Sequence, residues 1–281
     1  MSFFISPSDV HHLIDDPDYL LFDATFVLPN MKRDAIAEYH DNHIKGAQFF
    51  DINAIADQTS DLPHMVPSAA DFSHMMQARG LSHHHKIILY DNSPFLSAAR
   101  AWWLLRLFGK EDVFVIDGGL PAFLASGGTT TSQPTAPLAR GDFEATAPLA
   151  QMITFAALRQ EIESGQAPQI IDARPAGRFN GAAAEPRAGL RSGHMPGAIN
   201  VPVTDLLDPQ TRAIRDLTTI KEMFERAGLD FTRPAVTSCG SGVTAAGLTL
   251  ALAELGKYDI ALYDGSWAEW GASDAPIICS S

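Results

Sequence analysis

Short apolar runs alternate with segments of helical periodicity along most of this chain. Runs with the length and composition of buried strands occupy residues 20–23, 87–90, 113–116, 170–173 and 234–237. Apolar residues recur at helical spacing in residues 68–79, 97–108, 154–164, 218–227 and 244–255. Buried strands that alternate with helices predict an α/β fold, with mostly parallel sheets and helices on both faces.

The predicted helices are bounded by residues that favour helix ends. Thr154 and Thr218 stand where two of them begin, and threonine is a common N-cap. Glycines follow the last helical residue of the other segments, where the left-handed conformation of a C-cap is easy for glycine: Gly80, Gly109, Gly228 and Gly256. These signals support the helical assignment independently of the apolar spacing.

The chain contains an internal repeat. The segments 21–24, 43–47, 78–81 and 116–119 recur in the same order as 170–173, 194–198, 226–229 and 263–266, at an offset of about 150 residues. Two homologous domains explain this order. We predict an N-terminal domain at residues 1–126, a linker rich in turn residues at 127–150 and a C-terminal domain at 151–281.

Composition limits the partners and the compartment. The 281 residues are 46% hydrophobic and 19% charged, with a net charge of 20 − 33 = −13, which argues against binding to nucleic acid or to an anionic membrane. The sequence contains neither an apolar stretch long enough to cross a bilayer nor the basic start of a signal peptide. Two cysteines do not make a disulfide framework, so we predict a reducing, cytoplasmic compartment.

Cys239 is the main candidate for chemistry. It follows the apolar run 234–237 and begins the loop Cys239-Gly240-Ser241-Gly242-Val243-Thr244 before a helix. Backbone N–H groups and a helix N-terminus near a sulfur favour thiolate over thiol. Ligands bind beyond the carboxyl ends of parallel strands, which is where Cys239 falls. The repeat places Asp91 opposite Cys239, so only the second domain carries the nucleophile.

The repeat, the His-x-x-Gly-Ala elements at 43–47 and 194–198 and the segment Asp-Gly-Ser-Trp-Ala-Glu-Trp at 264–270 resemble the tandem rhodanese-type sulfurtransferases. The resemblance covers essentially the whole chain. It implies two homologous rhodanese-like domains, with a persulfide-forming cysteine in the second. Thiosulfate-specific members typically carry Cys-Arg-Lys-Gly-Val-Thr, whereas the loop here is similar to that of the 3-mercaptopyruvate sulfurtransferases.

The resemblance also implies how the substrate is bound. Arg178 and Arg187 match the substrate-binding pair of the family, and a planar guanidinium suits a carboxylate beside a ketone. The loop residues Gly240, Ser241, Gly242, Val243 and Thr244 would hold the anionic sulfur through their N–H groups. The expected partners are 3-mercaptopyruvate and a thiol acceptor such as thioredoxin, without a cofactor or metal.

The family further implies a proposed acid–His–Ser relay. The matching residues are Ser241 and, from the first domain, His64, while the acidic position falls on Asn53. Asparagine can accept a hydrogen bond from imidazole but cannot stabilise imidazolium by charge. The sequence leaves open whether Asn53, Asp51 or Asp57 supports His64.

Other polar residues have weaker claims. Arg174 either contacts substrate or braces the loop, and the sequence does not decide between the two roles. For His194 we expect a turn-stabilising role, for Cys279 no role, and for the triplet 83–85 no metal site, because adjacent histidines point in different directions.

Three competing functions are considered. Phosphatases of the same domain type need an arginine six positions after the cysteine, and Ala245 occupies that position. A thiosulfate sulfurtransferase is the nearest alternative within sulfur transfer. A non-catalytic sulfur-carrier or binding module is the third, because a carrier loaded by another enzyme would keep the same cysteine.

Overall fold

The N-terminal domain is built on a five-stranded sheet in which every pair of neighbouring strands is parallel. The structure, a computed structural model, describes residues 2–28 and 30–279. The sheet has the order β1-β6-β5-β2-β4, with strands β1 (Phe4–Ile5), β2 (Tyr19–Asp23), β4 (Gln48–Phe49), β5 (Lys86–Tyr90) and β6 (Val113–Ile116). Its helices are α1 (Pro7–Val10), α2 (Ala35–Asp41), α3 (Ala69–Ala78), α4 (Ala98–Leu107) and α5 (Gly119–Ala125).

The C-terminal domain repeats this arrangement. Its parallel sheet has the order β10-β9-β11-β12-β8, with strands β8 (Gln151–Ile153), β9 (Gln169–Asp172), β10 (Ile199–Asn200), β11 (Ala235–Ser238) and β12 (Ile260–Tyr263). Its helices are α6 (Phe155–Glu163), α7 (Ala176–Phe179), η1 (Val203–Leu206), α8 (Leu217–Ala227), α9 (Val243–Glu254) and α10 (Ser266–Trp270). Read from β4 and from β10, the two sheets have the same strand order, which confirms the duplicated α/β fold predicted from the repeat.

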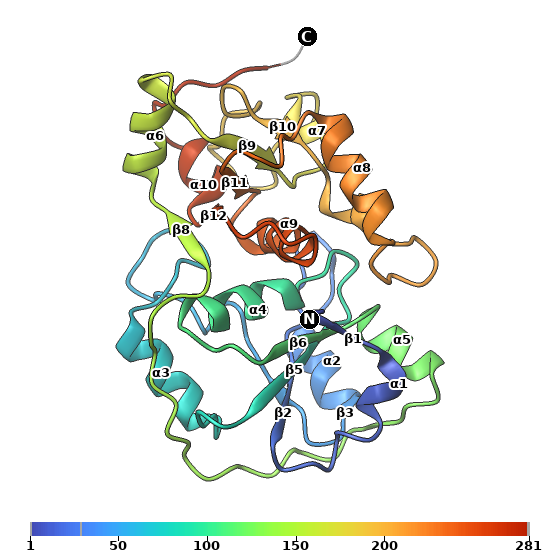
Figure 1. Cartoon of the computed structure of the whole chain (residues 1–281). Coiled ribbons are helices and arrows are strands. Elements are labelled where there is room, and N and C mark those ends of the chain that lie inside the picture. Colours follow the sequence, from blue (N-terminus) through green and yellow to red (C-terminus); the bar gives the residue numbers. More distant parts are fainter. Residues whose placement is uncertain (1, 29, 280–281) are drawn as a thin grey trace.

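The two domains meet through α4 and α9, which lie against each other between the two sheets (Figure 1). Both helices are apolar on nearly all sides, as expected of helices that are covered on every face. Ten of the twelve residues of α9 are buried, and residues of both helices belong to one continuous set of core side chains that spans the two domains. The active-site loop at the start of α9 therefore begins in the interface.

Most predicted helix ends agree with the structure, and one N-cap was wrong. Thr154 caps α6 by accepting from Ala157 N at 3.3 Å. Helix α8 begins one residue before Thr218 and is capped instead by Asp216, which accepts from Thr219 N at 2.9 Å. The two- and three-residue strands at the sheet edges, β1, β4, β8 and β10, were not predicted, because such short segments show no periodicity.

The predicted linker runs along the N-terminal domain. Its strand β7 (Thr130–Thr131) pairs antiparallel with β3 (His43–Ile44), and Phe143 is buried in the core. The division into 1–126, 127–150 and 151–281 stays a prediction. Among the helices of the described residues, none is long and apolar enough to cross a membrane.

Candidate active site

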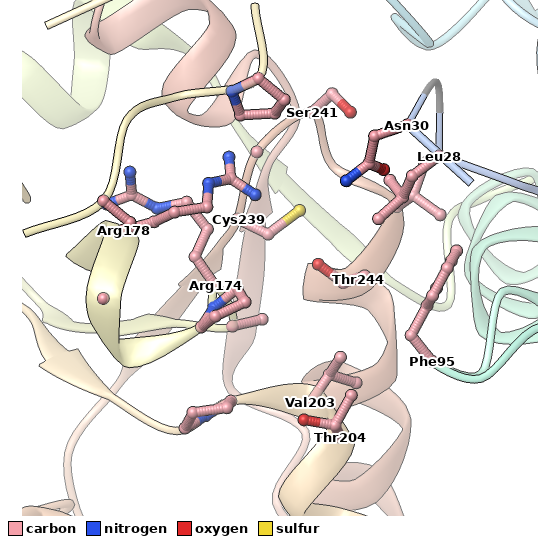
Figure 2. A pocket seen from close by; sticks show the side chains of 18 of the residues that line it. Leu28, Asn30, Phe95, Arg174, Arg178, Val203, Thr204, Cys239, Ser241 and Thr244 are labelled. Carbon is pink, nitrogen blue, oxygen red and sulfur yellow. The ribbon is translucent and has the colours of Figure 1, made fainter. Parts of the chain in front are cut away.

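Cys239 lies directly beyond the carboxyl end of β11, on the loop that leads into α9. Its side chain is buried, and the residue is only 1% exposed. It lies on the wall of a cavity of about 410 Å³ (Figure 2). The cavity is lined from both domains, and from the loop itself by Gly240, Ser241, Val243 and Thr244. A thiol in this position can react only with a molecule that enters the cavity.

The loop is held from behind by Ser266, at the start of α10. Ser266 Oγ accepts from Cys239 N at 3.2 Å and from Gly242 N at 3.1 Å, and it donates to Tyr263 O at 2.8 Å. The next two amides of α10 donate at 2.9 Å to the carbonyls of Cys239 and Gly240. The loop backbone is thus fixed before any substrate arrives, which is the condition for effective electrostatic stabilisation.

Gly242 has a different place from the one that the family resemblance implies. Its N–H is directed to Ser266 Oγ, and the residue does not line the cavity. Its φ of +77° lies in the left-handed region, and a Cβ there would come within 2.9 Å of Asp264 O. Gly242 is needed for the loop conformation, while the cavity-lining residues of the loop remain the candidates for holding the sulfur.

Arg178 and Arg187 bring positive charge to the same side of the cavity. The Arg178 guanidinium lies over Gly240, where a Cβ would be 3.1 Å from Nη2. Arg187 Nη2 lies 3.5 Å from Ser241 Oγ. Burial lowers the pKa of Arg187, while Cys239 opposes that shift electrostatically. Both guanidinium groups are therefore beside the thiol-bearing loop, although neither is part of it.

Glu185 orients the arginine cluster. Its carboxylate accepts from Arg178 Nε at 3.2 Å and from Arg174 Nη1 at 2.8 Å. Arg174 also pairs with Asp172 at 2.7 Å, donates to Gly193 O and stacks over Trp267. With these partners Arg174, which is 1% exposed, is held at the end of β9, and it also lines the cavity.

His64 reaches the loop from the N-terminal domain. Its Nδ1 lies 3.1 Å from Ser241 Oγ, and its Nε2 lies 3.1 Å from Asn53 Oδ1. Burial, aided by the positive charge of Arg100, lowers the pKa of His64 from 6.5 to about 4. The imidazole is thus neutral near pH 7, and with Nε2–H donating to Asn53 its Nδ1 can accept from the Ser241 hydroxyl.

The two alternative acids lie elsewhere. Asp51 accepts from Asn53 N, and Asp57 accepts from Thr59, each at 2.9 Å. Asn53 is therefore the residue that contacts His64. The geometry brings together the three residues of the expected relay, with an amide in place of the acid.

The loop after β5 in the N-terminal domain has the same place in the fold as the Cys239 loop, but its side chains differ. Asp91 follows β5, as Cys239 follows β11, and its carboxylate accepts from Ser93 N at 2.8 Å and from Ala98 N at 2.7 Å. The hollow beside it has a volume of about 10 Å³. Burial raises the pKa of Asp91 from 3.8 to about 6. The backbone N–H groups at this loop thus bind the carboxylate of the loop's own residue, Asp91.

His194 and Cys279, which we expect to take no part in the reaction, each contact a backbone carbonyl group. His194 Nδ1 lies 2.9 Å from Phe179 O, and its ring stacks on Phe179. Cys279 is exposed near the C-terminus, with its Sγ 3.3 Å from Ser192 O.

Comparison with known proteins places this architecture. The model of the Rhodanese-like domain matches residues 6–126 and 154–273. The chain belongs to the rhodanese-like family. It is 41% identical over 266 residues to the 3-mercaptopyruvate sulfurtransferase of Escherichia coli K12, covering 94% of this chain and 93% of that protein. It is 36% identical over 293 residues to the mitochondrial thiosulfate/3-mercaptopyruvate sulfurtransferase 1 of Arabidopsis thaliana, covering 97% and 77%.

A solved structure agrees with the whole fold. The crystal structure of SseA from Escherichia coli superposes with a TM-score of 0.85 at 37% identity, covering 95% of this chain and 99% of that one. Both rhodanese-like domains and their relative arrangement are therefore features of the family.

Several residues of this rhodanese-like site were not found from the sequence. The wall opposite the arginines comes from the N-terminal domain, through Phe26, Leu28, Asn30 and Phe95 (Figure 2). Glu185 and Ser266 were not assigned roles, although Ser266 lies in the segment 264–270 and Glu185 stands two residues before Arg187. A buried acid between arginines and a serine at a tight turn have no periodic signal; only the fold brings them to the site.

Proposed function

We propose that this protein is a 3-mercaptopyruvate sulfurtransferase that works through a persulfide on Cys239. The approach of Arg178 to Gly240 carries the proposal. Because Gly240 has no side chain, the guanidinium can lie over the loop, and the loop itself contributes no cation. The positive charge is thus offset from the sulfur, which suits a donor whose ketone and carboxylate are separated from its thiol by one and two carbons. The names of the similar proteins support the same donor.

The first half-reaction forms the persulfide. The Cys239 thiolate attacks the sulfur of the donor, an S–S bond forms, and the C–S bond breaks with its electrons passing to the enolate of pyruvate. Protonation of the enolate carbon gives pyruvate. The N–H groups of the cavity-lining loop residues and the N-terminus of α9 stabilise negative charge on sulfur throughout.

Arg178 and Arg187 orient the donor. Their guanidinium groups hold the carboxylate and ketone oxygens, so that the donor sulfur faces Cys239. The positive charge of Arg187 also stabilises the negative charge that develops on the enolate oxygen. Glu185 limits the directions that Arg178 can adopt, which fixes the guanidinium before the donor binds.

His64 and Ser241 handle protons. Neutral His64 accepts through Nδ1, so the Ser241 hydroxyl can exchange a proton with the reacting groups while Asn53 holds the imidazole in place. In the second half-reaction a thiol acceptor attacks the terminal sulfur and leaves Cys239 as thiolate. Reduced thioredoxin fits this role in the reducing, cytoplasmic compartment predicted from the sequence.

Thiosulfate is the alternative donor, and one similar protein is named for both activities. A dianion would gain from cations on the loop, and residues 240–242 provide none. We therefore expect thiosulfate to be the poorer donor by at least about tenfold in kcat/KM, equivalent to about 1.4 kcal/mol. A replacement of Gly240-Ser241 by Arg-Lys is expected to narrow this ratio.

Single-turnover assays with both donors test the proposal. Wild-type protein mixed with excess 3-mercaptopyruvate should release pyruvate and gain the mass of one sulfur atom. Cys239→Ser should do neither, and Cys279→Ser should behave as wild type. Faster use of thiosulfate by the wild type would refute the donor assignment. A protein that neither releases pyruvate nor gains sulfur from 3-mercaptopyruvate, but gains sulfur from a persulfide donor, would be a carrier instead.

A further inference from the structure

Arg100 is a buried cation at the centre of the domain interface. It extends from α4 of the N-terminal domain and is fully buried, with its guanidinium 4.8 Å from the centre of the Trp103 ring. It forms an ion pair with Asp264 of the C-terminal domain, with 2.8 Å between Nη2 and Oδ1. The side chains are 1% and 3% exposed. The proposed chemistry does not use either residue directly.

The pair binds the backbone of both active-site segments. Arg100 Nη2 donates to His64 O, and Nη1 lies 3.4 Å from Gly242 O in the Cys239 loop. Asp264 Oδ2 accepts from Val66 N at 2.7 Å, two residues after His64 in the chain. Asp264 also lies two residues before Ser266, which clamps the loop. One ion pair thus connects the histidine and the cysteine loop.

His64 needs such an anchor. Its φ of +63° lies in the left-handed region, which is unfavourable for a residue with a side chain and persists only where the surroundings impose it. The hydrogen bonds to the carbonyl of His64 and to the amide of Val66 fix the backbone that follows His64. A buried ion pair is weak evidence for a gain in stability, because desolvation offsets much of the attraction. Its contacts suggest a role in geometry.

We propose that Arg100, paired with Asp264, is a positioning residue for sulfur transfer, which holds His64 against Ser241 across the domain interface. The inference rests on the proposed function for its kinetic consequence. It assigns to the N-terminal domain a further contribution to the site, beyond His64 and the cavity wall: the interdomain pair sets the position of the proton-handling group.

Electrostatics adds a consequence that can be measured. The charges around His64 are Arg100 from α4 and Arg187 from the arginine cluster, with Asp264 beyond Arg100 and with Asp57 and Asp61 beside the hollow that His64 lines on its outer side. Arg100 and Arg187 both lower the pKa of His64, after burial. Loss of the Arg100 charge should therefore raise the pKa of the imidazole.

The kinetic test is a double-mutant cycle in the full-length protein. We expect Arg100→Lys to lower kcat for 3-mercaptopyruvate roughly 10- to 100-fold, with KM changed less than about threefold, because lysine keeps the charge but cannot bind in two directions. In a His64→Ala background the same substitution should lower kcat less than about threefold. Equal factors in both backgrounds would mean that Arg100 acts independently of His64, which would overturn the proposal. Arg106→Met, on the same helix but away from the site, is the matched control.

The second test needs no substrate, so it stands even if the donor assignment fails. Arg100→Met combined with Asp264→Asn removes both buried charges and avoids leaving one of them unpaired. NMR titration of the histidines, with His64 assigned from the His64→Ala spectrum, should show a higher His64 pKa in this variant than in the wild type and a low one in Arg100→Lys. An unchanged titration in the neutral variant would overturn the proposal. The lysine variant retains the buried charge and tests the hydrogen bonds if the neutral pair does not fold.

Discussion

The two domains share a sheet order and a loop position, yet only one has room for a substrate. Cys239 lies at a cavity of about 410 Å³, whereas the hollow beside Asp91 has about 10 Å³. The backbone after β5 and after β11 is anchored in the same way: Leu120 N donates to Asp91 O and Trp267 N to Cys239 O, both at 2.9 Å. The architecture is thus equivalent, and the difference lies in the side chains.

The difference teaches how an anion-binding loop can be closed. In the N-terminal loop the Asp91 carboxylate accepts from two N–H groups, Ser93 N and Ala98 N. In the function that we propose for the C-terminal loop, the N–H groups of the cavity-lining residues hold the sulfur of Cys239 and its persulfide. Loops at helix N-termini tend to bind negatively charged groups. In the N-terminal domain this group is the Asp91 side chain, and in the function that we propose it is the sulfur of Cys239 in the C-terminal domain.

Each domain also extends an equivalent segment, here called an arm, to the other domain: residues 64–66 of the N-terminal domain and residues 212–214 of the C-terminal domain. Val66 N donates to Asp264 Oδ2, and Ile214 N donates to Asp117 Oδ1, each at 2.7 Å, so that each domain binds the other's backbone. Two residues before these amides stand His64 and Arg212, both in the left-handed region, with φ of 63° and 60°. His64 meets the reactive loop and Arg212 meets the closed one, at 3.4 Å from Asn92 Oδ1. The degenerate domain thus carries the arm that we propose for proton handling in the reaction.

The strongest test of the comparison exchanges the central residues. Cys239→Ser should abolish turnover, because a serine hydroxyl provides no thiolate and cannot form a persulfide. Asp91→Cys on that background should restore nothing, because the N-terminal loop lacks a cavity and the paired arginines. Pyruvate release and intact mass measure both. Sulfur loading of the Asp91→Cys variant would show that the N-terminal loop is more open than its 10 Å³ hollow implies.

A second test removes Arg178 and Arg187, the arginines that line the cavity beside the Cys239 loop. Arg178→Met or Arg187→Met should each weaken kcat/KM for 3-mercaptopyruvate by roughly 2–4 kcal/mol, the cost of removing one partner of a desolvated charged contact. Arg226→Met, an exposed arginine of α8, is the control and should change little. Equal kcat/KM for Arg187→Met and wild type would show that Arg187 is not a donor contact.

Much of this difference was readable from the sequence because it is local. The loop after β11, the loss of the cysteine in the first copy and the offset of the repeats are contiguous patterns, and they located Cys239 and the two domains. The pairing of His64 with Ser241 came from resemblance, and the structure places the two side chains 3.1 Å apart.

What the sequence did not show depends on long-range packing. Arg100 and Asp264 are 164 positions apart in the numbering (264 − 100), so no spacing links them. The same holds for Phe26 and Cys239, which line the same cavity. The place of Gly242 behind the cavity follows from Ser266, whose contact requires the turn at the start of α10. The edge strands were missed because two-residue strands form only where a neighbour offers a ladder of hydrogen bonds.

Asp91→Asn would sharpen the comparison through stability. Burial raises the pKa of Asp91 to about 6 in the folded protein, whereas the value in the unfolded chain is 3.8. Between pH 3.8 and pH 6 the folded state therefore keeps a proton that the unfolded chain has lost. The stability that this proton contributes is present below pH 3.8 and is lost as the pH rises through 6. Each pKa unit corresponds to about 1.4 kcal/mol. The free energy of unfolding of Asp91→Asn, relative to wild type, should therefore rise by up to about 3 kcal/mol between pH 4 and pH 7.

That difference is measured by urea unfolding of both proteins across the pH range. Asparagine loses some of the hydrogen bonds from Ser93 N and Ala98 N at every pH, so the comparison uses the change with pH and not the absolute value. A relative stability that is flat with pH would mean that the Asp91 carboxyl is ionised to the same extent in both states.

The smallest expected effect comes from Asn53→Asp, which gives the His64 arm the acid that its family pattern has. A carboxylate beside His64 Nε2 stabilises imidazolium, so the His64 pKa should rise from its value of about 4. The acidic limb of the kcat profile should move to higher pH by less than about two units, and kcat at pH 7 should change only a few-fold, about 1 kcal/mol. Asn42→Asp, an exposed site in the same domain, adds the same charge and should leave the profile unchanged. An unshifted acidic limb in Asn53→Asp, together with a harmless His64→Ala, would mean that the interdomain arm holds the loop but moves no proton.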